Sequence, residues 1–130
     1  MAHYLDTSAL VKLVVEEPET AALRRWLRRS DRQPVSSDLA RTELLRAVRR
    51  GAPDRMELAR QVLDSIVLVE LTTAIFEMAG LLDPAIVRSL DAIHLAAAID
   101  LGDDLDAVIV YDDRLADAAR ANGLTVVAPG

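Results

Sequence analysis

Cysteine is absent from this chain, aromatic residues make up only 3% of it, and it has just two histidines. Without cysteine the protein can form neither disulfide bonds nor thiolate metal sites, which favours a location inside the cell. Because 52% of the residues are hydrophobic and so few are aromatic, the core must be built mainly from Leu, Val, Ala and Ile. Two histidines in separate segments offer no paired imidazole site of the kind that binds zinc.

Long apolar runs are absent as well. No segment approaches the roughly 18 apolar residues of a membrane-spanning helix, and no charged and then apolar signal segment precedes the first expected strand. No repeat, low-complexity stretch or linker divides the 130 residues. We therefore expect a soluble protein that does not bind membranes and that forms a single domain over residues 1–130.

Charge is unevenly distributed along the sequence. The net charge of the chain is −6, with +3 on residues 1–60 and −9 on residues 61–130. Lys12 is the only lysine among 15 basic residues. An acidic chain is not typical of nucleic-acid binding. The arginines of the first half nevertheless leave room for a local phosphate-binding surface.

Short apolar runs alternate with longer helical patterns. Several runs, such as "IVLVE" and "AVIV", are continuous, which is typical of parallel strands covered on both faces. The predicted strands are 2–5, 34–36, 66–70, 107–110 and 124–127, and the predicted helices are 8–15, 19–30, 38–50, 54–65, 72–82, 89–101 and 113–122. Gly123 follows the last helix as a C-terminal cap. The pattern predicts an α/β fold, a three-layer α/β/α sandwich around a parallel central sheet of about four or five strands.

Acidic residues fall where predicted strands end and the following helices begin. Ligands of parallel α/β sheets bind at this carboxyl edge, so these residues are the candidates for a site. Asp6 ends the first strand, Asp112 and Asp113 follow the fourth, Asp91 lies at the start of "SLDAIHLAAAID", and Glu43 lies one turn into the helix after the second strand.

Each aspartate also has a structural explanation. Asp6 and either Asp112 or Asp113 can cap a helix, which is worth about 1 kcal/mol, and Asp91 is favourable in a first helical turn. Glu43 is harder to explain in this way, because it lies close to the apolar stripe of its helix, where an unpaired carboxylate is costly. Acids gathered at one edge repel one another, which is typical of a site for a hard divalent cation such as Mg²⁺.

Two other residues favour packing roles over binding roles. His94 lies three residues after Asp91 on the same helix, where a histidine packed in the core is expected more often than a metal ligand. Trp26 could stack on a nucleic-acid base, but packing in the core or an interface is the favoured interpretation.

Four motifs together resemble the PIN-domain ribonucleases, and among them the VapC toxins of bacterial toxin–antitoxin pairs. They are "YLDTSALVKL" at 4–13, "SSDLARTELLRA" at 36–47, "LDAIHLAAAI" at 90–99 and "VYDDRLADAA" at 110–119. Each motif alone is weak, whereas all four in this order are specific. The resemblance covers nearly the whole chain.

The resemblance implies a PIN-like α/β/α fold whose acidic pocket binds Mg²⁺ or Mn²⁺. Asp6, Glu43, Asp91 and Asp112 match the four acids of the family, which act as metal ligands and catalytic residues. Thr7 and Ser8 match hydroxyl positions where one side chain hydrogen-bonds a carboxylate or a metal-bound water. Two further positions are supporting candidates: Asp113 from outside the metal's ligand shell, and Arg114 by orienting Asp112 or meeting substrate phosphate.

The residues permit hydrolysis by a metal-activated water, because no Ser–His or Cys–His pair is evident for covalent catalysis. Glu43 is either a metal ligand or the base for that water. The family implies RNA as substrate, with a 5′-phosphate and a 3′-hydroxyl as products. The candidate RNA-binding rim consists of Arg24, Arg25, Arg28, Arg29, Arg46, Arg49 and Arg50.

The resemblance also implies partners and a location: a homodimer, a cognate VapB-type antitoxin, and the bacterial cytoplasm, with release from the cell as a second location. A non-catalytic PIN-like module that binds RNA or protein is the alternative function. Two other α/β classes fit less well. A signalling receiver domain needs adjacent acids after the first strand and a lysine near the end of the chain, and a haloacid dehalogenase-type phosphatase needs Asp-x-Asp where residues 6–8 read Asp-Thr-Ser.

Overall fold

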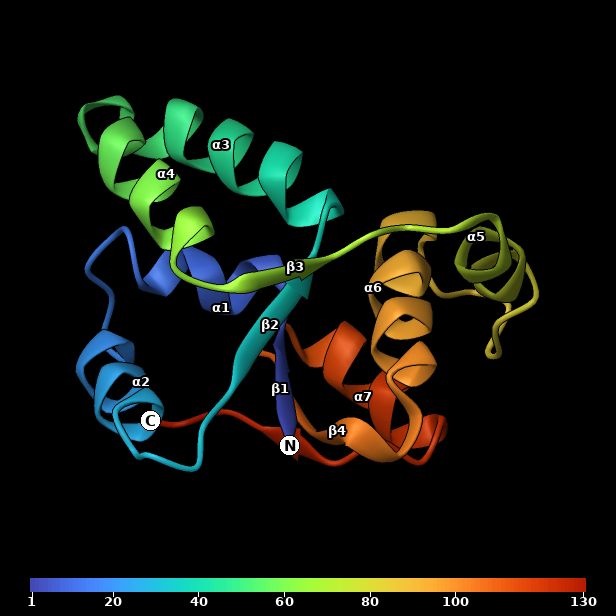
Figure 1. Ribbon diagram of the computed structural model, residues 1–130. Helices are drawn as coiled ribbons and strands as arrows, with labels where there is room; N and C mark the ends of the chain where they lie inside the picture. Colours follow the sequence, from blue (N-terminus) through green and yellow to red (C-terminus); the bar gives the residue numbers. More distant parts are fainter.

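A computed structural model describes all 130 residues as strands and helices that alternate along the chain (Figure 1). The strands are β1 (Ala2–Leu5), β2 (Pro34–Ser37), β3 (Val67–Val69), β4 (Leu105–Ile109) and β5 (Val126–Val127). The α-helices are α1 (Thr7–Lys12), α2 (Thr20–Leu27), α3 (Leu39–Gly51), α4 (Met56–Asp64), α5 (Thr73–Gly80), α6 (Ser89–Asp100) and α7 (Asp113–Ala121). Two 3₁₀ turns, η1 (Pro53–Arg55) and η2 (Gly102–Asp104), precede α4 and β4.

The five strands form one parallel sheet in the order β3-β2-β1-β4-β5. β1 lies at its centre, and all four of its residues are buried because neighbouring strands and helices cover it on every side. The chain adds β2 and β3 on one side of β1 and then crosses to add β4 and β5 on the other. This arrangement confirms the predicted parallel sheet and its five strands.

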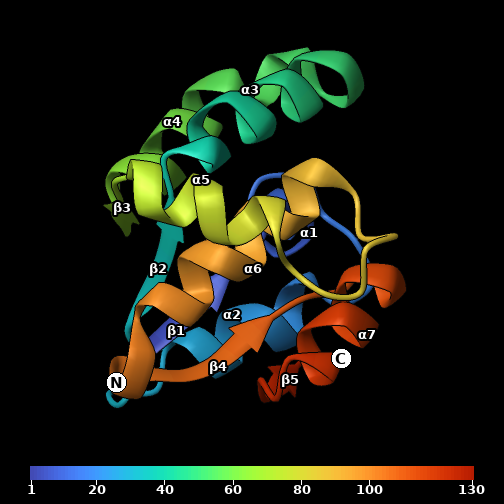
Figure 2. The ribbon, with the colours of Figure 1, turned by 90° about the vertical axis from the view of Figure 1, so that its right-hand side faces the viewer.

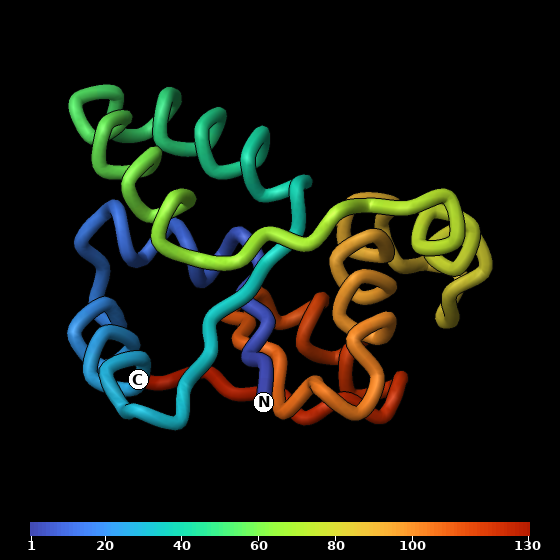
Figure 3. The backbone as a smooth tube through the Cα atoms, in the orientation of Figure 1, coloured from blue at the N-terminus to red at the C-terminus, as the bar shows by residue number.

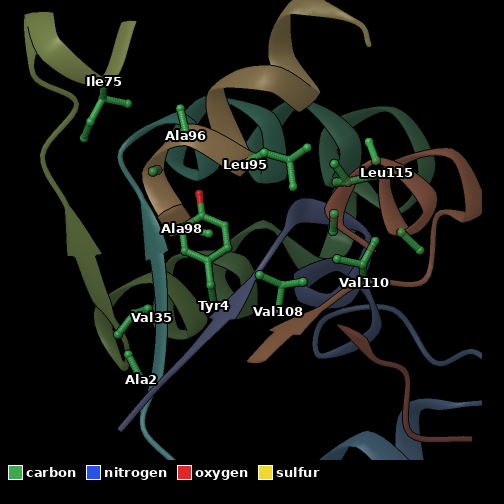
Figure 4. Packing of buried hydrophobic residues seen from close by; sticks show 14 residues of the cluster. Ala2, Tyr4, Val35, Ile75, Leu95, Ala96, Ala98, Val108, Val110 and Leu115 are labelled. Atoms are coloured by element: carbon green, nitrogen blue, oxygen red, sulfur yellow. The ribbon is translucent and has the colours of Figure 1, made fainter. Parts of the chain in front are cut away.

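Helices cover both faces of the sheet, and one hydrophobic cluster lies on each face (Figures 1 and 2). Alternation along β1 sends Tyr4 to one face and Leu5 to the other. The Tyr4 cluster contains residues of α5, α6 and α7, and Figure 4 shows the Tyr4 ring extending from β1 toward Leu95 and Ala98 of α6. The Leu5 cluster contains residues of α1, α2, α3 and α4. The three-layer sandwich is confirmed.

Local signals explain where several helices begin and end. The carboxylates of Asp6 and Asp112 accept hydrogen bonds from the backbone amides of Ala9 and Leu115, so both aspartates are helix N-caps. Gly123 has a φ of 77° just beyond α7, a conformation that favours glycine, as its predicted capping role requires.

The predicted elements all form, and the differences lie at their ends. The helix expected over 8–15 ends at Lys12 and the one expected over 19–30 ends at Leu27. In both cases the last turn tightens, with the amides of Leu13 and Arg29 reaching the carbonyls of Leu10 and Trp26. None of the helices combines the length and the apolar character needed to cross a membrane.

Candidate active site

The candidate site lies where the chain changes direction across the sheet. β2 and β4 pair with β1 on opposite sides. The chain segments that follow β1 and β4 therefore leave the carboxyl ends of these strands toward opposite faces of the sheet. Asp6 directly follows β1, and its amide donates to the carbonyl of Ile109, the last residue of β4, at 3.3 Å. Asp112 follows three residues later. The two aspartates therefore lie just beyond the carboxyl ends of neighbouring strands.

Asp6 is the most buried of the candidate acids, with only 5% of its surface exposed. Its Oδ1 accepts hydrogen bonds from the Ser8 hydroxyl at 2.6 Å and from the Ala9 amide at 3.2 Å. Burial raises the pKa of Asp6, although the Ser8 hydrogen bond and the nearby His94 imidazole counteract this rise. Ionisation of Asp6 therefore lowers the stability of the folded state.

Ser8 also fixes the position of the segment after β4. Its hydroxyl oxygen accepts a hydrogen bond from the Tyr111 amide at 3.0 Å while the same hydroxyl donates to Asp6. One small side chain thus ties the start of α1 to the residue before Asp112. The hydroxyl next to Asp6 in sequence, that of Thr7, serves the other carboxylate, Glu43.

Glu43 projects from the second turn of α3 and is held at one oxygen. Its Oε1 accepts hydrogen bonds from the Thr7 hydroxyl and from His94 Nε2, each at 2.6 Å. Burial by itself would raise the pKa of Glu43, but these two hydrogen bonds and the charge of His94 outweigh it, so the net pKa is lowered. Glu43 is therefore an oriented, ionised carboxylate.

His94 joins Glu43 to the core of the protein. It is 3% exposed, and its Nδ1 lies 2.8 Å from the Tyr4 hydroxyl while its Nε2 faces Glu43. A carboxylate only accepts hydrogen bonds, so Nε2 carries the hydrogen. The resulting series of hydrogen bonds links Tyr4 of β1 to His94 of α6, and His94 to Glu43 of α3.

The remaining acids lie closer to solvent. Burial raises the pKa of Asp91, and the neighbouring charge of Asp112 raises it further, with a smaller contribution from Glu43. Carboxylates of α6, α3 and the start of α7 are thus close enough to repel one another. Asp112 and Asp113 are both exposed.

The donor set suits a hard cation. Every candidate ligand is a carboxylate or hydroxyl oxygen, and the mutual repulsion at Asp91 is what a bound cation would relieve. No group of three or more Asp, Glu, His or Cys side chains is spaced to hold a metal ion on its own. Mg²⁺ in phosphate-processing sites is held by one or two carboxylates together with waters and substrate phosphate, so the acids present fit it.

The two helices that carry the predicted arginine rim, α2 and α3, lie in separate parts of the molecule (Figures 1 and 3). Trp26 of α2 packs against His3 near the amino end of β1, with ring centroids 5.2 Å apart, and Arg32 stacks on Trp26 at 3.9 Å. This contact places the α2 segment, which carries Arg24, Arg25, Arg28 and Arg29, beside β1 at His3. Arg46, Arg49 and Arg50 follow Glu43 along α3 and are exposed.

Arg114 does not orient Asp112, since it forms no ion pair with that carboxylate. His94 and Tyr4 are the site residues that sequence reasoning missed. His94 is buried, as expected, yet it is also the direct partner of a candidate catalytic acid. Its position one helical turn after Asp91 was the available signal.

Comparison with known proteins agrees with this geometry. The family model of the PIN domain matches residues 3–121. The chain belongs to the PIN-domain family. Two relatives of this PIN domain are Mycobacterium tuberculosis proteins: ribonuclease VapC46 is 47% identical over 129 residues, covering 98% of each chain. Ribonuclease VapC47 is 44% identical over 131 residues, covering 98% of this chain and 96% of its own.

Solved structures share the fold of this PIN domain. VapC20 of Mycobacterium tuberculosis, a Sarcin-Ricin loop cleaving toxin, superposes with a TM-score of 0.76 at 16% identity, over 98% of this chain and 100% of its own. A chain of the VapBC2 assembly of Rickettsia felis, solved with a promoter DNA fragment, gives a TM-score of 0.74 at 15% identity over the whole of both chains. A chain of a Klebsiella pneumoniae toxin–antitoxin complex gives 0.74 at 21% identity, over 100% of this chain and 98% of its own.

The cost of burying Asp6 predicts that Asp6→Asn stabilises the metal-free protein at pH 7, by roughly 0.5–2 kcal/mol in the free energy of unfolding. The amide keeps an oxygen for the Ala9 cap but carries no charge. Because the folded-state pKa of Asp6 is raised, its ionisation destabilises the fold above that pKa, and the penalty disappears as the pH falls toward the unfolded value of about 3.9.

Urea unfolding of the two proteins between pH 4 and pH 8 measures this difference. Asp103→Asn, in the exposed η2 turn, is the matched control and should leave stability nearly unchanged. A variant that is no more stable than the native chain at pH 7, or whose advantage does not shrink in acid, would contradict the prediction.

Proposed function

We propose that this PIN domain is a metal-dependent endoribonuclease that acts as the toxin of a type II toxin–antitoxin system. The proposal is carried by the 44–47% identity of this chain to VapC ribonucleases over almost its whole length. It is supported by Asp6 directly after β1 and by the repulsion that Asp112 and Glu43 exert on Asp91. The reaction is hydrolysis: water adds to phosphorus, the bond from phosphorus to the 3′ oxygen breaks, and the products carry a 5′-phosphate and a 3′-hydroxyl.

Asp6, Asp91 and Asp112 are the residues that would hold Mg²⁺ or Mn²⁺, directly or through water. Bound there, the cation supplies a water of lowered pKa and offsets negative charge on the phosphate. Ser8 keeps Asp6 oriented by donating to its Oδ1. Asp113 is exposed beside Asp112 and contributes to the negative charge of this edge.

Glu43 serves better as a metal ligand than as the base for the attacking water. Thr7 and His94 occupy its Oε1 and lower its pKa, and a carboxylate with a lowered pKa is a weak proton acceptor at neutral pH. Both hydrogen bonds engage the same oxygen, so neither occupies Oε2. His94, Tyr4 and Thr7 are positioning residues that act through Glu43.

The partners follow from the relatives. Several solved neighbours are toxin–antitoxin complexes, and VapC20 cleaves the Sarcin-Ricin loop. We propose that this chain likewise binds RNA as substrate and a VapB-type antitoxin as inhibitor, forms a homodimer and acts in the bacterial cytoplasm.

Asp91→Asn and Asp112→Asn should each lower RNA cleavage by about 100-fold or more, because each removes a charge that holds the cation at the reacting phosphate. Cleavage of a structured RNA in Mg²⁺ or Mn²⁺ measures the effect, and chelation by EDTA should abolish it. Asp103→Asn is the control and should cleave normally.

Isothermal titration with Mn²⁺ gives a second readout of the same variants. Binding should weaken in Asp91→Asn and Asp112→Asn but not in Asp103→Asn. Full activity in both site variants would refute the assignment of the acidic pocket. Absence of cleavage together with absence of acid-dependent Mn²⁺ binding would favour the non-catalytic module.

Two isosteric substitutions test whether His94 positions Glu43. The amide nitrogen of Gln at position 94 reaches where Nε2 lies and can still donate to Glu43, whereas Asn reaches only the Tyr4 side. We expect His94→Gln to retain most activity and His94→Asn to lose about 10- to 100-fold, mainly in kcat and in Mn²⁺ affinity.

Thermal unfolding separates this effect from loss of stability. Both amides leave one former partner of His94 without a hydrogen bond, so both should lower Tm to a similar extent. If activity follows Tm rather than the identity of the retained hydrogen bond, His94 has only a structural role.

A further inference from the structure

A cavity of about 640 Å³ opens beside Asp91, and the supporting candidate Arg114 also lines it. It lies between the start of α6, the exposed face of α7 and the segment 81–88 that connects α5 to α6, which Figure 2 shows arching beside α7. The Asn122 side chain donates to the carbonyl of Asp83 at 2.8 Å, which ties this segment to the end of α7. The cavity thus has a defined wall on each of its three sides.

Two arginines face this cavity without ion-pair partners. Arg88 directly precedes α6 and Arg114 lies in the first turn of α7. Neither forms a salt bridge, whereas Asp117, the other acid of the lining besides Asp91, is paired with Arg120 at 3.4 Å. Arg88 is close enough to Asp91 to lower its pKa against the effect of burial. Two free guanidinium groups therefore flank the candidate catalytic edge.

The rest of the lining is apolar. Pro84, Ile86 and Val87 form one side, with Ala118 and Ala121 on the α7 side. Ile86 is 90% exposed, although a side chain of this size and character gains by burial. A mostly apolar cavity of this volume with a few fixed charged groups is typical of a site for a small-molecule-sized ligand.

We propose that this cavity binds the nucleotide adjacent to the scissile phosphate of the RNA substrate, an inference that rests on the proposed function. Arg88 and Arg114 hold the backbone phosphate of that nucleotide through their planar donor groups. The base lies against Ile86, Val87 and Pro84, which replaces exposed apolar surface with a stacked contact. A nucleotide fits better than a peptide carboxylate, because the cavity offers two cationic side chains for a phosphate and apolar side chains for a base, next to Asp91.

Cleavage kinetics of two RNA oligonucleotides in Mn²⁺ test the subsite. One RNA extends on both sides of the cleavage point, and the other is shortened on the side that occupies the cavity. Arg88→Gln and Arg114→Gln should each raise KM for the longer RNA by about tenfold. Ala121→Phe, which fills the cavity from an exposed position at the end of α7, should do the same. Ala121→Phe should not affect the shortened RNA.

Arg60→Gln is the matched control, since Arg60 is exposed on α4 and has no ion pair. Anisotropy of the labelled longer RNA without metal gives a measure of binding that does not depend on cleavage. If native protein binds RNA through Arg88 and Arg114 but does not cleave it, the proposed function fails and the subsite stands. Unchanged KM and unchanged RNA binding in the subsite variants would overturn the proposal of a nucleotide subsite. If the same variants then captured an antitoxin peptide more weakly, the cavity would be a protein-binding site instead.

Discussion

The hydrogen bond between Glu43 and His94 is the contact on which the acidic edge depends. Glu43 belongs to α3 on one face of the sheet and His94 to α6 on the other, so this 2.6 Å bond joins the two helical layers. Tyr4 extends the connection to β1, the central strand. Because His94 and Tyr4 are almost fully buried, losing either partner would leave polar groups unpaired in the core, and the layers are therefore held in one relative position.

Around this fixed connection the protein accumulates negative charge at the expense of its own stability. Burial raises the pKa of Asp6 and of Asp91, and Asp112 adds repulsion at Asp91. Helix capping by Asp6 and Asp112 compensates for part of this cost, since each accepts a backbone hydrogen bond at a helix start. Capping alone does not explain why acids gather at one edge and repel one another, whereas a bound cation would relieve that repulsion.

Much of the architecture was predictable because it rests on local pattern. Continuous apolar runs predicted buried parallel strands, and the acids that end β1 and β4 could be placed together because parallel strands share a carboxyl edge. The position of α2, which carries part of the predicted arginine rim, could not be predicted. Which part of the sheet a surface helix such as α2 covers depends on its packing, here the contact of Trp26 with His3, and the helical period of the sequence does not encode that.

Local sequence patterns predicted the elements and the helix caps, because these depend on residues within about one turn of each other. The alternation of strands and helices predicted the parallel sheet. The sequence also determined which acids were candidates. The hydrogen bonds that orient those acids depend on tertiary packing, since His94 and Glu43 are separated by 51 positions and meet across the sheet. Tertiary packing also brings Arg88 and Arg114 together as lining residues of one cavity beside Asp91. Their proximity results from the arrangement of α6, α7 and the segment 81–88 around that cavity.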